Sequence, residues 1–302
     1  MTSSRNSTAM ERTTAVQLFS PQRRFGVGQT FYFANDKVRW FNGVFASRNM
    51  DNLMYVNENN QGVIYNSRFT FVPVYAKEGE KYLHFGGHYM YQQNPDDTAN
   101  MATPGNARTG GFSRGQSWYS VSALAPHQYN QGGIEMAWGK GPLAFASELF
   151  AGTYDKGRDI YGGYVEVRYF LTGDHRAYDK KLGVLGNVKT KKNLDFVETC
   201  VNTYHHGPQK GFLANSLGAW ELFAQWNFTD TARLFYVDGT QGGRTVDTVL
   251  GLNWYWNPNT RMMFEYVHTD GTRLASATAP ATSSASFRAT EDIFATSFRF
   301  SF

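Results

Sequence analysis

The feature that most constrains the fold of this chain is an alternation of apolar and polar residues with a period of two. In residues 218–228, Trp220 and Trp226 fall on one face, while Glu221 and Gln225 fall on the other. A period of two is the repeat of a β-strand, whose successive side chains point to opposite sides. Helical periodicity is scarce, so the sequence predicts an all-β protein.

About a dozen segments show this alternation, and each is close to the roughly 9–11 residues that cross a bilayer as a tilted strand. They are residues 23–33, 37–45, 66–75, 81–92, 116–125, 131–139, 143–152, 158–171, 218–228, 246–256, 261–266 and 288–302. Some connections are tight, as at 139–141 and 256–260, whereas 95–115, 173–215 and 272–286 are long and polar. No domain boundary interrupts the series, so we expect a single domain over residues 1–302.

Composition narrows the class of β protein. Aromatic residues make up 16% of the chain and charged residues only 18%, yet the mean hydropathy is −0.47. No apolar stretch approaches the roughly 18 residues that a spanning helix needs, which excludes helical membrane proteins. The chain is therefore either a β-rich soluble protein or a transmembrane β-barrel, whose alternating strands keep the average hydropathy low.

The chemistry of the two strand faces favours the transmembrane barrel. Apolar faces carry rings near strand ends, such as Trp254 with Trp256, which is typical of the aromatic girdles at membrane interfaces. A soluble sandwich would mix more Val and Ile into a tight core. The opposite faces carry charges, which are costly in lipid or in a dry core but not in a water-filled lumen. These charged residues are Arg24, Arg68, Arg168, Arg261, Arg299, Glu135, Glu148, Glu166, Glu221 and Glu265. We therefore expect an antiparallel transmembrane β-barrel.

Charge and motif content exclude several other functions. The net charge of +4 is small and dispersed, so no nucleic-acid partner is expected. Cys200 is the only cysteine, which excludes an internal disulfide and a multi-thiolate metal site. His84 and His88 share a polar strand face, where we expect them to line a lumen without a metal. The residues show no convergent serine, histidine and acid, so neither a catalytic site nor a cofactor is predicted.

Five stretches of the chain make a family resemblance visible. They are residues 7–12 (STAMER), 83–92 (LHFGGHYMYQ), 164–178 (YVEVRYFLTGDHRAY), 218–228 (GAWELFAQWNF) and 250–268 (LGLNWYWNPNTRMMFEYVH). Together with the terminal strand they resemble the phosphate-selective porin family of the porin O and P type, over about residues 7–302 and in family order. The last strand also ends on Phe302, as outer-membrane proteins commonly do.

The resemblance implies a fold, a location and a function. Family members are sixteen-stranded barrels of the bacterial outer membrane that form trimers and have signal peptides and narrow, anion-selective channels. It implies that this chain is the C-terminal three-quarters of such a porin and that about four N-terminal strands are absent. We expect a homotrimer in outer-membrane lipid that lets phosphate or other small anions diffuse passively.

In the family, lumen arginines form a ladder that draws anions inward, and a lysine cluster contributes near the constriction. The corresponding candidates for pore lining and anion contact are Arg12, Arg24, Arg68, Arg168, Arg261 and Arg299. Gln225 stands where family members commonly carry Arg, and the lysine cluster has no clear counterpart. For each arginine, a wall-bracing pair with an inward glutamate is the alternative to anion contact.

Other questions stay open at the level of sequence. The basic segment 173–215 is expected at the periplasmic end, because the last strand must finish there; it either folds into the lumen exit or stays on the surface. The channel could also be a general, non-selective one. A barrel enzyme and a soluble carbohydrate-binding sandwich are the alternatives from other classes.

Overall fold

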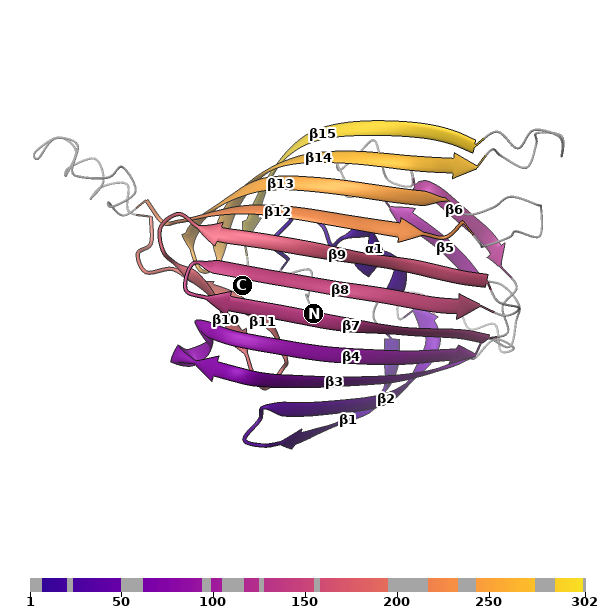
Figure 1. The fold of residues 1–302 in the computed structure, drawn as a ribbon, viewed down its shortest axis with the longest axis horizontal. Coiled ribbons are helices and arrows are strands. Elements are labelled where there is room, and N and C mark those ends of the chain that lie inside the picture. Colours follow the sequence, from indigo (N-terminus) through magenta and orange to yellow (C-terminus); the bar gives the residue numbers. More distant parts are fainter. Residues whose placement is uncertain are drawn as a thin grey trace, which may run out of the picture.

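Eleven antiparallel strands form one large curved sheet in the computed structural model, which describes residues 7–20, 24–49, 62–93, 99–104, 117–124, 128–154, 158–194, 217–232, 243–274 and 286–300. In sheet order the strands are β1 (Arg24–Phe33), β2 (Val38–Asn49), β3 (Val63–Ala76), β4 (Lys81–Gln93), β7 (Gln128–Lys140), β8 (Leu143–Tyr154), β9 (Arg158–Phe170), β12 (Ala219–Asp230), β13 (Arg244–Asn257), β14 (Thr260–Leu274) and β15 (Ser286–Phe300). Figure 1 shows them side by side, with the helix α1 (Thr14–Phe19) behind the sheet. The prediction of an antiparallel all-β fold is confirmed. Within the described residues, β1 and β15 are the edges of the sheet.

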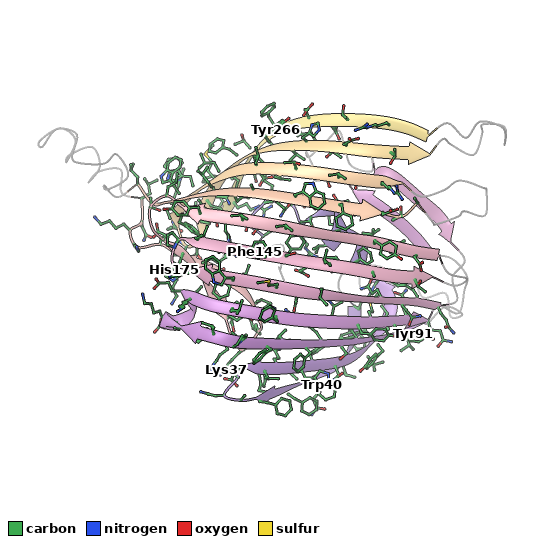
Figure 2. All side chains as sticks on the ribbon, viewed as in Figure 1. Lys37, Trp40, Tyr91, Phe145, His175 and Tyr266 are labelled. Atoms are coloured by element: carbon green, nitrogen blue, oxygen red, sulfur yellow. The ribbon has the colours of Figure 1, made fainter. Side chains whose placement is uncertain are left out.

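The alternation assigns the two faces of the sheet as predicted. On β12, Leu222 and Trp226 are 44% and 46% exposed, whereas Glu221 is fully buried and Gln225 is 5% exposed. The apolar face is thus the outer one and the polar face lies inside, which is the reverse of a water-soluble protein. In Figure 2, Trp40, Phe145 and Tyr266 belong to this outer set, on three different strands.

Aromatic rings gather on the outer face where β12, β13 and β15 approach the tight turns. Trp220 stacks on Trp254 with ring centroids 5.0 Å apart, and Trp254 meets Trp256 edge to face at 5.4 Å. Trp256 in turn contacts Phe298 at 5.0 Å. Such a continuous row of rings is the interfacial girdle that the sequence predicts.

Most of the short connections between wall strands lie at one end of the sheet, which we call the tight-turn end (left in Figure 1), although the three-residue connection between β8 and β9 joins them at the other end. Those at the tight-turn end include the turns between β1 and β2, between β7 and β8 and between β13 and β14. Gly141 adopts a positive φ of 59° in the β7–β8 turn, a conformation that glycine takes without a Cβ penalty. The 3-10 helix η3 (Lys77–Gly79) links β3 to β4 at the same end.

One predicted wall strand lies elsewhere. The segment 116–125 contains β6 (Ser117–Leu124), which pairs with β5 (Ala99–Pro104) in a separate two-stranded sheet, while β4 pairs directly with β7. Alternation shows that a segment is extended but does not specify its partner, and the long connection after β4 satisfies its own backbone as a hairpin. The prediction that 116–125 belongs to the wall is therefore wrong.

Two further elements lie on the inner face. The first is the stretch of residues 7–20 that contains α1, and the second is the hairpin of β10 (His175–Asp179) and β11 (Val184–Lys189). We call them the inner segment and the inner hairpin. In the part of the chain that the structure describes, no helix has the length and apolarity to span a membrane.

Candidate functional site: the inner wall and the two inserted elements

The inner segment begins with a local helix and is fixed by apolar packing. The Thr13 hydroxyl caps α1 by accepting a hydrogen bond from the Val16 amide at 3.1 Å. Phe19 stacks on Phe150 of β8 with centroids 5.1 Å apart, and Ala15, Val16 and Phe19 are buried. A six-residue helix is unstable alone, so contact with the wall holds this one in place.

Polar residues of the wall fasten the same segment along its length. The Thr8 hydroxyl donates to Glu166 at 2.7 Å, and the Thr14 hydroxyl donates to Asp247 at 2.8 Å. The Met10 amide donates to Glu265. These three carboxylates are almost completely buried, so they serve as acceptors for the segment and are withdrawn from the aqueous lumen.

Two of the sequence candidates, Arg168 and Arg261, take part in this fastening. Arg168 is 1% exposed and donates to both Glu166 and Thr8 at 3.1 Å. Arg261 is 7% exposed and donates to the Ser7 carbonyl oxygen at 2.9 Å. The contact of Arg168 with Glu166 corresponds to the bracing alternative, whereas Arg261 braces the inner segment through a backbone carbonyl instead of a glutamate.

The inner hairpin crosses the inner face of the sheet at the tight-turn end. On one side, Arg176 donates to the Tyr255 hydroxyl at 3.1 Å, and the same hydroxyl donates to Glu221. On the other side, the Gly183 carbonyl accepts from Arg68 of β3 at 2.7 Å. The hairpin thus bridges strands that are far apart in the sheet order, β13 and β3.

Tyr178 packs at the centre of this crossing. Its ring stacks on Tyr82 with centroids 4.9 Å apart, and its hydroxyl lies 2.5 Å from His84 Nδ1. Burial raises the pKa of the Tyr178 phenol above its ordinary value, since a phenolate would lose its hydration there. His84 thus points to the inner face but is fully buried against the inner hairpin, so the prediction that it lines the lumen is wrong.

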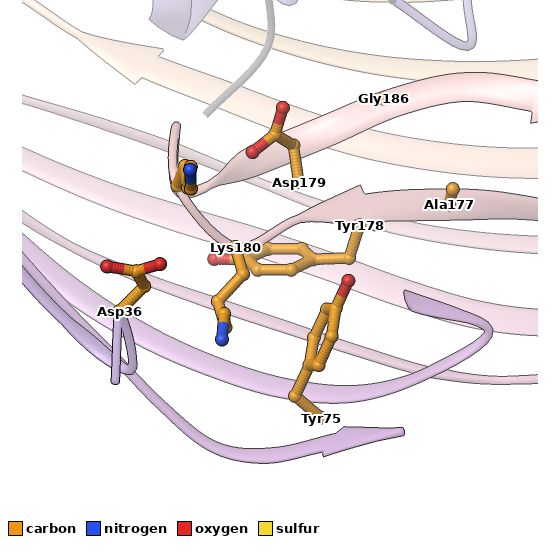
Figure 3. A pocket seen from close by; sticks show the side chains of 8 residues that line it. Asp36, Tyr75, Ala177, Tyr178, Asp179, Lys180 and Gly186 are labelled. Carbon is orange, nitrogen blue, oxygen red and sulfur yellow. The ribbon is translucent and has the colours of Figure 1, made fainter. Parts of the chain in front are cut away.

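The tip of the hairpin forms a pocket of about 480 Å³ with the β1–β2 turn and the end of β3 (Figure 3). Lys180 donates to the Asn35 carbonyl at 2.7 Å, and its ammonium lies 5.3 Å from the centre of the Tyr75 ring. Asp36 and Asp179 also line the pocket. Residues 175–189 of the basic segment therefore fold against the inner face; residues 195–215 lie outside the described part of the chain.

The remaining arginine candidates are only half-buried. Arg68 is paired with the buried Glu135 at 2.7 Å, and Arg299 donates to the Met10 carbonyl. The guanidinium groups of Arg12 and Arg24 have no hydrogen bond or ion pair to another residue that the structure describes, although the Arg12 carbonyl oxygen accepts from Gln17 at 2.7 Å. The six candidates therefore divide into two buried braces, two half-buried braces and two side chains without a described partner.

Sequence reasoning missed Arg39 of β2. Its register partner Thr70 is buried on the inner face, so Arg39 points inward as well. The Arg39 side chain is half-buried and has no hydrogen bond or ion pair to another described residue. The sequence signal is ambiguous because β2 is apolar on both faces: Trp40 and Val44 point outward, while Phe41 and Phe45 point inward.

Acidic and basic groups are segregated between two parts of the inner wall. The inner faces of β7–β9 and β12–β14, which we call the covered wall, lie beneath the inserted elements. Strands β1–β3, which we call the open wall although the tip of the inner hairpin contacts β3 at Arg68 and Thr70, contain no Asp or Glu at all. Every inward carboxylate of the covered wall is buried: Glu135, Glu148, Glu166, Glu221, Asp247 and Glu265.

Inward charges that keep some exposure are mainly guanidinium groups. They are Arg12, Arg24, Arg39, Arg68 and Arg299. Two acids, Glu11 and Glu291, also keep some exposure, so cations outnumber anions among these described inward groups. The half-exposed part of this inner surface is therefore positively charged on balance.

Gln225, where the sequence departs from the family pattern, is buried on the covered wall. Its amide donates to Glu166 at 3.0 Å, beside Arg168 and Thr8. A neutral donor thus completes the hydrogen bonding of that carboxylate. Among the described residues no cluster of three His, Cys, Asp or Glu could hold a metal ion.

Two comparisons with known proteins give different results. No curated protein matches the chain. Residues 1–290 match the model of a protein family described as "Phosphate-selective porin O and P", which leaves only the last twelve residues outside the match.

Proposed function

Because the chain belongs to the phosphate-selective porin O and P family, we propose that its outer-membrane channel prefers anions and passes phosphate. This family consists of channels of the bacterial outer membrane rather than enzymes. The outer face supports the location, since its exposed apolar residues match lipid and would be unfavourable in water. The same face is unsuited to a soluble carbohydrate-binding sandwich.

The observation that carries the anion preference is the segregation of charge. The acids of the covered wall are buried and hydrogen-bonded, whereas the open wall holds Arg24, Arg39 and Arg68 without any acid. Three of these carboxylates, Glu135, Glu166 and Glu221, lie beside Arg68, Arg168 and Arg176, whose charges compensate theirs. The unbalanced field in the lumen then comes from the half-exposed arginines.

Guanidinium groups suit passage of phosphate for two reasons. They stay charged at every physiological pH, and their planar fork matches two phosphate oxygens. Conduction also requires binding that is weak enough for release, so several shallow cationic sites serve better than one deep site. Arg12, Arg24 and Arg39 provide such spaced positions in this proposal, with Arg68 and Arg299 contributing while they brace.

Closure of the barrel and assembly into trimers are further parts of the proposal. In hydrocarbon, an unpaired strand edge leaves backbone groups without hydrogen bonds, so the edges at β1 and β15 need partners in the working channel. About four additional strands and a homotrimer stay predictions from the family resemblance. Chemical cross-linking in native membranes, followed by gel electrophoresis and mass spectrometry of the intact polypeptide, tests both.

Single-channel recording in planar bilayers tests the anion preference. Under a potassium chloride gradient we expect a reversal potential of the anion-selective sign, and added phosphate should reduce the chloride current. A reversal potential near zero would identify a general diffusion channel, and the cation-selective sign would contradict the proposal. The variant Arg24→Gln should lower the anion preference, whereas Arg244→Gln, an exposed outward residue paired with Asp230, should not.

A further inference from the structure

The inner face of β2 has a feature that a simple polar lumen does not explain. Phe41 and Phe45 point inward, with ring centroids 6.3 Å apart, and both are only half-buried. Lumen faces of water-filled barrels are polar, so half-exposed rings there need a reason.

Glycines leave the room that these rings occupy beside the backbone of the wall. A methyl group added at Gly28 would lie 2.7 Å from the Phe41 ring, and one added at Gly43 would lie 2.5 Å from the Phe45 ring. Each ring therefore covers the place where a neighbouring side chain would stand. The rings thus pack against the backbone at the glycines, Phe45 also packs against the buried apolar cluster, and both side chains keep part of their surface exposed.

Positive charge lies directly beside the rings. The Arg39 guanidinium carbon is 5.6 Å from the centre of the Phe41 ring, within the range of a cation–π contact. Arg68 is the register partner of Phe41 on β3, and no acid lies on β1–β3. The Arg39 side chain has no hydrogen bond or ion pair to another described residue; its Nε is buried without a partner, which leaves the terminal nitrogens of the guanidinium group for an anion.

We propose that Phe41, Phe45 and Arg39 form a lumen site for anions that carry a flat apolar group, such as aryl phosphates. The proposal rests on the proposed anion channel and names a class of substrate within it. The anionic end of the ligand binds Arg39, and its ring packs on the phenylalanine rings in an offset or edge-to-face arrangement. A small inorganic anion uses only the first of these contacts.

Inhibition of chloride current by two probes of equal charge tests the site. Phenyl phosphate and methyl phosphate are both dianions at mildly alkaline pH, so their ratio of inhibitory concentrations isolates the contribution of the ring. We expect phenyl phosphate to inhibit at about threefold to tenfold lower concentration, as expected for one aromatic contact. Equal inhibition by the two probes would overturn the proposal.

Matched variants locate the effect. The double variant Phe41→Leu, Phe45→Leu should bring the ratio to about one, whereas Phe69→Leu, an outward ring on β3, should keep it. Arg39→Gln should weaken inhibition by both probes and keep their ratio. A preference for phenyl phosphate that survives in the double variant contradicts this site, and heat-modifiable migration confirms that each variant is folded.

The outcomes also separate this inference from the function on which it rests. A wild-type channel that is anion-selective and inhibited by phosphate, yet treats the two probes alike, refutes only the aromatic site. A channel with no anion preference refutes the proposed function and this site together.

Discussion

The covered wall and the open wall arise from the same alternation of residues but make different inner surfaces. The covered wall is rich in carboxylates. The inner segment donates to Glu166, Asp247 and Glu265 and the inner hairpin lies beside Glu221, whereas Glu135 and Glu148 accept from wall residues. The open wall has arginines and rings over glycines, and its inward charges stay half-exposed. An inward position therefore does not by itself make a residue part of the ion path, because coverage by inserted elements decides that.

Removing a carboxylate from the covered wall should have the largest effect on stability. Glu166→Ala would leave Arg168 buried without its ion-pair partner and would also remove the acceptor of Thr8 and Gln225. We expect the free energy of unfolding to fall by about 3–5 kcal/mol, measured by urea denaturation in lipid vesicles. Glu78→Ala removes an exposed pair with Lys189 and should change it by less than about 1 kcal/mol. Equal losses in both variants would contradict the distinction between covered and exposed charges.

A methyl group on the inner face should cost more than one on the outer face. At Gly251 a Cβ would collide with the Phe223 ring, whereas at Gly87 it would meet only the Gly133 carbonyl at an ordinary 3.5 Å. We expect Gly251→Ala to lower the free energy of unfolding by about 1–3 kcal/mol. Gly87→Ala should leave it nearly unchanged, and the same denaturation series compares the two. If both variants are equally stable, Phe223 is free to move away from the wall.

Charge changes should affect selectivity only where the charge is half-exposed. Arg12→Glu should reduce the anion-to-cation permeability ratio about fivefold, equivalent to about 1 kcal/mol for a charge near the path in high dielectric. Glu148→Gln alters a buried residue that accepts from Tyr164, so the ratio should stay within about twofold of wild type. Reversal potentials in a salt gradient measure both. A larger effect at Glu148 would mean that the covered wall faces the ion path.

The smallest expected effect concerns the docking of the inner hairpin. Tyr178→Phe removes the hydrogen bond to His84 and should lower stability by about 1 kcal/mol. Because burial raises the pKa of Tyr178 from its ordinary 10.0, the folded state retains this proton after the unfolded state has lost it. Stability should therefore fall as the pH rises above about 10, and Tyr178→Phe should show a smaller fall. Identical pH profiles of the two proteins would exclude this contribution of Tyr178.

The sequence predicts the two faces of most wall strands but not the elements that cover the inner face. Period two and the outward rings predict the faces of β12, β13 and β14, because lipid and water impose opposite chemistry on alternate residues. The partner of β6 was not predictable, since alternation carries no information about the neighbouring strand.

The different burial of the candidate arginines also could not be predicted from the sequence. Arg168 and Arg24 look alike in sequence, each being a cation on a polar strand face. They differ because Thr8, 160 residues away from Arg168, returns to cover one and not the other. A contact between residues this far apart in the chain depends on the tertiary fold and leaves no local sequence signal. Arg39 was missed for the opposite reason, since β2 is apolar on both faces and its inward side could not be recognised.

The inner hairpin also has a mechanical consequence. It is attached near β13 through Arg176 and Tyr255 and near β3 through Gly183 and Arg68, so it works as a strut between opposite parts of the wall. A curved sheet held only by its own ladder could flatten into an oval cross-section under lateral pressure from the bilayer. With the strut in place, any such flattening must break hydrogen bonds of charged groups. We therefore expect the cross-section at the tight-turn end to be stiffer than at the opposite end.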